Sequence, residues 1–182
     1  MRSAFPVLAA LLLLPAASAL TACTDTTGVE NFLRGDSIVL ASVNGPSTRA
    51  TAVDVLSGVI LSFPERPAYA GAYDFQVRQH GATFWFAPNP GDSGLRGTGL
   101  LETTRTYEHP GNAPRPVDEY RRDSIAVAVG KSYFVQTRVV PSTCSTTSKY
   151  ALINVLAVSA DSGTVTFRMV SNQQCDDERL ES

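Results

Sequence analysis

The 182-residue sequence lacks a long apolar segment, an excess of positive charge and any internal repeat. Its longest apolar run, Ala4–Leu14, has eleven residues, whereas a helix that spans a bilayer needs about 20. The 15 Lys and Arg residues are outnumbered by 17 Asp and Glu residues. This mildly negative balance argues against a nucleic-acid partner, because nucleic-acid binding needs a basic surface.

Cysteine and histidine are also scarce, with three and two residues. The sequence contains no Cys-x-x-Cys pair, and no Cys and His residues have the spacing of a zinc motif, so we expect no metal site. His80 and His109 are the only side chains that could bind a metal or haem strongly. Without a motif around them, they are expected to be ordinary turn and loop residues.

The amino-terminal segment is organised like a secretion signal. Arg2 precedes the apolar run, Pro15 ends it, and small residues follow. Two cleavage sites compete there. Ala17-Ser18-Ala19 fits the small-x-small rule of ordinary signal peptidase, whereas Leu20-Thr21-Ala22-Cys23 resembles the lipobox of bacterial lipoproteins.

The lipobox resemblance implies a lipid on Cys23. In that family the equivalent thiol receives a diacylglyceryl group, and cleavage then makes the cysteine the first residue. Several acyl chains on one residue form a lasting anchor, whereas one chain holds only marginally. Thr24, in place of Asp, implies the outer rather than the inner membrane. We therefore expect residues 1–22 to be a lipoprotein signal peptide and the membrane to be a partner in the bacterial cell envelope.

With Cys23 assigned to lipid, Cys144 and Cys175 remain as a pair. They flank a predicted hairpin made of Tyr150–Ser159, a turn, and Thr164–Ser171, so both lie at its open end. An oxidising envelope compartment favours a disulfide between them. Closing this loop would contribute roughly 3.5 kcal/mol in the chain-entropy model.

The rest of the chain alternates apolar and polar residues in short stretches and shows little helical periodicity. About ten such stretches separated by Gly- and Pro-rich turns predict an all-β fold, an antiparallel sandwich or barrel. Besides the two hairpin strands, the expected strands are Ser37–Val43, Ala50–Leu56, Val59–Phe63, Tyr73–Arg78, Thr83–Ala87, Thr98–Thr106, Ser124–Val129 and Ser132–Val139.

We expect residues 23–35 to form the lipidated terminus and a short tether, and residues 36–182 to form one domain. Gly130-Lys131 suits a two-residue hairpin loop between neighbouring strands. The Pro-rich segment Glu108–Asp118 is expected to be a long exposed loop. The charged stretch Asp118–Asp123 is interpreted as a solvated edge, and Asp176-Asp177-Glu178 as an acidic tail.

The order of several strands also resembles the HmuY-type family of bacterial lipoproteins, whose characterised members bind haem. The matching pieces are Leu56-Ser57-Gly58-Val59 followed by Tyr73–Arg78, then Tyr133–Arg138, and Lys149–Ile153 followed by Ser162–Phe167. This resemblance implies an all-β fold and makes haem a permitted ligand. It assigns no ligand residues, so paired binding of haem iron by His80 and His109 is a separate hypothesis.

Gly91-Asp92-Ser93-Gly94 resembles the nucleophile loop of trypsin-like proteases. That chemistry requires a His and then an Asp well before the Ser. Here His80 precedes Ser93 by only thirteen residues, and Asp92 is the only acid between them. A polar turn is the simpler interpretation. The sequence thus favours a lipid-anchored, non-enzymatic binding or structural module with no cofactor, with a haem-binding lipoprotein and a cryptic hydrolase as the alternatives.

Overall fold

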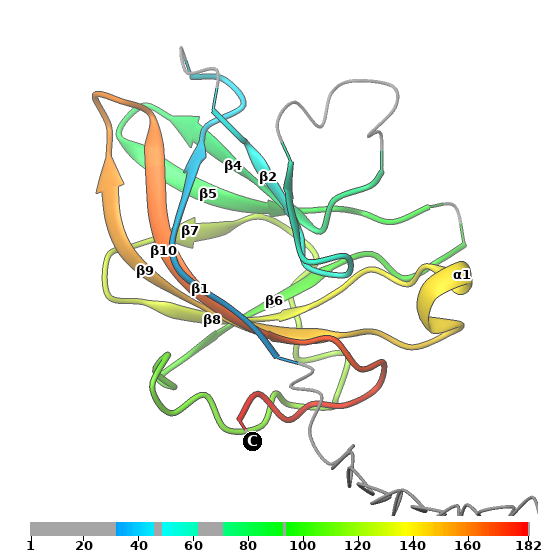
Figure 1. Cartoon of the computed structure of the whole chain (residues 1–182). Helices are drawn as coiled ribbons and strands as arrows, with labels where there is room; N and C mark the ends of the chain where they lie inside the picture. The colour runs from blue at the N-terminus through cyan, green and yellow to red at the C-terminus, as the bar shows by residue number, and fades with distance from the viewer. Residues whose placement is uncertain (1–31, 46–48, 62–70, 93, 182) are drawn as a thin grey trace, which may run out of the picture.

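A computed structural model describes residues 32–45, 49–61, 71–92 and 94–181 of the chain. Cys23 and Ser93 therefore lie outside the described residues. Two five-stranded antiparallel sheets make up the domain (Figure 1). The first sheet has the order β1 (Phe32–Ala41), β10 (Thr164–Asn172), β9 (Tyr150–Ser159), β8 (Ser132–Gln136) and β6 (Gly99–Thr103). The second has the order β3 (Val59–Leu61), β2 (Ala52–Asp54), β4 (Phe75–His80), β5 (Thr83–Pro88) and β7 (Ile125–Val127).

These sheets confirm the predicted all-β, sandwich-like fold, and each predicted stretch overlaps a strand. The one helix in the described ranges is α1 (Pro141–Cys144). No helix of this part of the chain has the length and apolar character needed to cross a membrane.

Alternation along β10 shows why these segments form strands. Val165, Phe167 and Met169 are buried between the sheets, whereas Thr166 and Arg168 on the opposite face are partly exposed. The predicted hairpin is confirmed, because β9 and β10 pair antiparallel around a turn that Gly163 closes at a φ of 64°. A positive φ is easily reached by glycine, since it has no Cβ.

The core lies between the two sheets and is centred on aromatic rings. Phe86 of the second sheet lies 6.0 Å from Phe167 and 5.6 Å from Tyr133 of the first sheet, measured between ring centroids. Phe75 lies 5.1 Å from Phe86 in an edge-to-face arrangement, a geometry that the ring quadrupoles favour. The Tyr133 hydroxyl also donates to the Ala126 carbonyl of β7 at 2.8 Å, so a partly buried hydrogen bond joins the sheets.

The outer face of the first sheet is covered. Most of Glu108–Asp118 is an exposed loop, as predicted, but Pro110 and Ala113 within it are buried. Phe134, Leu152 and Val170 lie on that outer face and pack in a second apolar cluster with Tyr107 and Leu180. The Ala113 amide donates to the Glu178 carbonyl at 2.9 Å, and the Leu180 amide donates to the Gly111 carbonyl at 3.0 Å. The segment after β6 and the carboxyl-terminal segment therefore cover this face together, as Figure 1 shows below the sheet.

Two further expectations change. The predicted two-residue hairpin at Gly130-Lys131 is wrong, because β7 pairs with β5 in the second sheet and β8 pairs with β6 and β9 in the first. The turn there crosses from one sheet to the other. The structure also moves the boundary between tether and domain, since Phe32–Gly35, which the sequence places in the tether, pair with β10 as the start of β1.

Candidate functional site

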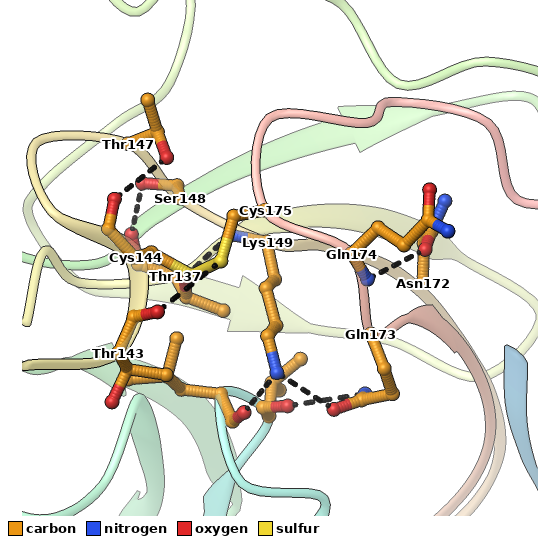
Figure 2. The surroundings of a disulfide bond; sticks show 12 residues. Thr137, Thr143, Cys144, Thr147, Ser148, Lys149, Asn172, Gln173, Gln174 and Cys175 are labelled. Atoms are coloured by element: carbon orange, nitrogen blue, oxygen red, sulfur yellow. Dashed lines mark hydrogen bonds between the residues drawn. A yellow bond between two sulfur atoms is a disulfide. The ribbon is translucent and has the colours of Figure 1, made fainter. Parts of the chain in front are cut away.

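The predicted disulfide is confirmed at one end of the sandwich. Cys144 ends α1, Cys175 follows β10, and their Cα atoms lie 5.5 Å apart. The bond therefore links the chain just before β9 to the chain just after β10, at the open end of the hairpin. Figure 2 shows the Lys149 side chain running past this disulfide towards Gln173.

Lys149 belongs to a cluster of four buried charged residues between the sheets. Asp54 ends β2 and Asp74 directly precedes β4, so both acids come from the second sheet. Arg138 follows β8 and Lys149 directly precedes β9, so both bases come from the first sheet. Each of the four residues is at most 8% exposed. Opposite charges thus face each other across the sandwich.

Arg138 makes the direct ion pairs of this cluster. Its Nη1 atom lies 2.9 Å from Asp54 Oδ1 and 3.1 Å from Asp74 Oδ1. The Lys149 ammonium donates to the Leu56 carbonyl at 2.8 Å and to Gln173 Oε1 at 3.1 Å. Burial lowers the pKa of Lys149, and the two aspartates oppose that shift.

Asp74 is the most completely enclosed member and carries a full set of donors. Its carboxylate accepts hydrogen bonds from the Leu56 amide at 2.9 Å, the Arg138 amide at 2.9 Å and the Thr98 hydroxyl at 3.0 Å. Burial raises the pKa of Asp74, while Arg138 and the amide donors act in the opposite direction. Burial lowers the pKa of Arg138, but the nearby carboxylates outweigh it and leave that pKa raised.

This arrangement is suited to joining the sheets. A buried charge is tolerated only when it is paired and hydrogen-bonded. Here Arg138 pairs with both acids across the interface, and Lys149 is hydrogen-bonded to the Leu56 carbonyl and Gln173. Sequence reasoning missed the cluster. The available signal was a charge inside an apolar stretch, as in Val53-Asp54-Val55 and Tyr73-Asp74-Phe75.

The two histidines lie on different parts of the fold. His80 is exposed at the end of β4. The β4–β5 turn there lies beside the β9–β10 turn, and a hydrogen bond from the Gln79 side chain to the Ala160 carbonyl joins the two. His109 is exposed in the segment after β6, and its amide donates to the Thr106 carbonyl. Figure 1 shows the β4–β5 turn at the top left and the segment after β6 at the bottom. The structure therefore does not bring the histidines together.

Three surface hollows lie in the described part of the chain. Their volumes are about 600, 370 and 190 Å³, and no histidine lines them. Among the residues that the structure describes, no three His, Cys, Asp or Glu side chains are grouped so that they could hold a metal ion.

Together, these features define a disulfide-linked antiparallel β-sandwich whose sheets are joined by buried ion pairs. No family model, no curated protein and no solved structure matches this chain.

Proposed function

We propose that the protein is a lipid-anchored module of the bacterial cell envelope that binds a partner or supports a structure without catalysing a reaction. The observation that carries the proposal is the use of the cysteines. The disulfide occupies Cys144 and Cys175, which leaves Cys23 in its lipobox-like sequence as the third cysteine. A disulfide of this kind is typical of exported proteins, and export is what the amino-terminal signal predicts.

A lipid on Cys23 would hold the domain close to the bilayer. Strand β1 begins at Phe32, so eight residues, Thr24–Asn31, separate it from Cys23. A fully extended chain of that length spans at most about 30 Å. The proposed anchor would therefore keep the sandwich near the headgroups of its own membrane.

The non-enzymatic part of the proposal is supported by the interactions inside the domain. The buried charged groups Asp74, Arg138 and Lys149 bond to one another or to neighbouring backbone and amide groups across the sheets. Between the sheets, these groups help to hold the fold together. The haem alternative gains no support from the separate positions of His80 and His109, and the hydrolase alternative depends on Ser93, outside the described residues.

Mass spectrometry of the protein from its native membrane, combined with cell fractionation, tests the anchor. We expect a mature chain that begins at Cys23 and carries diacylglyceryl and fatty acyl groups. Cys23→Ser should abolish the modification and move the protein out of the membrane fraction. The matched control is the Cys144→Ser, Cys175→Ser double variant, which should still carry the lipid. An unmodified chain beginning at Leu20 would refute the proposal.

A further inference from the structure

One of the surface hollows lies beside β4, where the chain leaves β1. Its volume is about 370 Å³, and the residues that line it are Val43, Asn44, Gln76 and Arg78. Small-molecule sites have volumes of about 300–1,000 Å³, so the hollow has the size of such a site. The Val43 amide donates to the Val77 carbonyl at 3.0 Å. This hydrogen bond fixes the chain after β1 against β4, and the hollow is therefore part of the fold.

The polar side chains of this hollow have donors that the fold does not use. Gln76 is only 6% exposed. With its amide oxygen turned towards Arg78, it accepts hydrogen bonds from Arg78 Nε at 2.9 Å and from Nη2 at 2.7 Å. A guanidinium carries five N–H donors, and the others of Arg78 have no partner in the described part of the chain. The exposed side-chain amide of Asn44 has none there either. A buried glutamine thus positions an exposed cation, and no acidic residue lines the hollow.

A tryptophan stands next to the hollow on the same face of the second sheet. Arg78 of β4 lies opposite Trp85 of the neighbouring strand β5 (Figure 1), and side chains in such positions are separated by about 4.5–5.5 Å at Cβ. Phe84 and Phe86 point into the core. Alternation therefore places Trp85 on the outer face, where it is partly exposed. Its partner on the other side is Ala126 of β7, whose small side chain covers little of the indole.

We propose that this hollow binds a sugar that carries a carboxylate group. The indole of Trp85 presents the negative face of its quadrupole, which attracts the partly positive C–H groups on the flat side of a sugar ring. The free N–H groups of Arg78 can pair with the two oxygens of a carboxylate. The amide of Asn44 can donate to sugar hydroxyls and accept from them.

An acidic sugar fits these groups better than a neutral sugar, because Arg78 is a cation with no acid beside it. The inference rests on the proposed function as a binding module, since it names a ligand for that module. The lipid on Cys23 is a separate property, and the two are tested by different measurements.

Titration of D-galacturonate into the full-length protein, in a detergent without sugar groups, tests the site. Trp85 is the single tryptophan, so the fluorescence of the protein reports binding beside the hollow. We expect a saturable change with D-galacturonate. D-galactose, which lacks the carboxylate, and acetate, which lacks the ring, should each bind about tenfold more weakly or less, because each loses one set of contacts. Binding of D-galactose or acetate as tight as that of D-galacturonate overturns the proposal.

Arg78→Gln removes the cation and keeps Trp85 as the reporter. It should weaken the binding of D-galacturonate about tenfold, to the level of D-galactose, because only the carboxylate contact is lost. The matched control is Arg105→Gln, which removes the same charge from an exposed arginine that lines a different hollow. This variant should bind D-galacturonate as the wild-type protein does, and an equal loss in both variants contradicts the proposed role of Arg78.

Thermal unfolding without sugar shows whether each variant folds. If Arg78→Gln does not fold, Asn44→Ala decides the question, since the Asn44 side chain makes no hydrogen bond within the described residues; this variant should also bind D-galacturonate more weakly. A tetrasaccharide of galacturonate that binds more tightly than the single sugar would identify an acidic polysaccharide as the source, and equal binding would identify a terminal acidic sugar. Absence of saturable binding of D-galacturonate to the wild-type protein overturns the proposal and leaves the proposed anchor standing.

Discussion

Arg138→Met tests whether the buried charges hold the two sheets together. Arg138 is the only base of the cluster in direct ion pairs, and it contacts both Asp54 and Asp74. Methionine keeps much of the side-chain volume and removes the charge. The substitution therefore leaves two buried carboxylates without their cation while changing the packing little.

The expected loss is large compared with the stability of a domain. Removing one partner of a buried ion pair typically costs about 3–5 kcal/mol, because the remaining charge stays buried. A domain is stable by only about 5–15 kcal/mol. Asp74 is fully buried and keeps its hydrogen bonds from the Leu56 amide and the Thr98 hydroxyl. We therefore expect a loss of about 3 kcal/mol at pH 7.

The loss should depend on pH with a defined sign. An aspartate in the unfolded chain has a pKa of about 3.9, and burial already raises the pKa of Asp74 in the folded protein. Without Arg138 that pKa rises further, so the folded state of the variant binds the proton more tightly than the unfolded state. The free energy of unfolding of the variant should therefore fall by up to about 1.4 kcal/mol per pH unit above pH 4, until Asp74 ionises in its folded state. In wild-type protein this fall ends at a lower pH, so the loss caused by the substitution should be smaller at pH 5 than at pH 8.

Urea unfolding followed by the fluorescence of Trp85, the single tryptophan, measures these changes. Arg121→Met is the matched control, because its ion pair with Asp123 is exposed, and it should cost no more than about 1 kcal/mol. Adding Asp54→Asn to Arg138→Met should restore part of the loss, since it removes one unpaired carboxylate. A loss below 1 kcal/mol for Arg138→Met, with no change between pH 5 and pH 8, would refute the reasoning.

Two other perturbations test the covalent and apolar contacts. Replacing Cys144 and Cys175 by Ser opens a loop with a sequence separation of 31 and should lower the free energy of unfolding by about 3.5 kcal/mol relative to the oxidised wild-type protein. Reduced wild-type protein is the control and should match the variant. Leu180→Ala removes a fully buried side chain from the second apolar cluster and should cost about 2–5 kcal/mol. Hydrogen exchange should then accelerate at the amides of Ala113 and Leu180. Unchanged exchange there would show that the carboxyl-terminal segment does not hold the segment after β6 on the outer face of the first sheet.

The sequence predicts the strands well because their signal is local. Alternation with a period of two is visible within five or six residues, as in Thr164–Ser171, and it reflects the pleat of the chain itself. The pairing of Cys144 with Cys175 is predicted for a related reason, since both flank one hairpin. These features need no knowledge of distant residues.

Contacts between distant residues account for what the sequence did not predict. The turn at Gly130-Lys131 suits a hairpin, yet β7 and β8 join different sheets because their partners, β5 and β9, lie elsewhere in the chain. The Pro-rich segment Glu108–Asp118 has the composition of an exposed loop. It is held on the protein because β8 and β9 have a second apolar face, visible in the near-continuous apolar run of Tyr150–Val155.

The sequence by itself determined that this chain forms an all-β domain with a disulfide at the end of its last hairpin, because pleat, turn and cysteine spacing are properties of neighbouring residues. Only the tertiary structure decided that Asp54 and Asp74 meet Arg138 and that Arg122 donates to the Gly97 carbonyl. Those encounters join residues more than 20 positions apart, and their charges are sheltered from water only after the two sheets have packed.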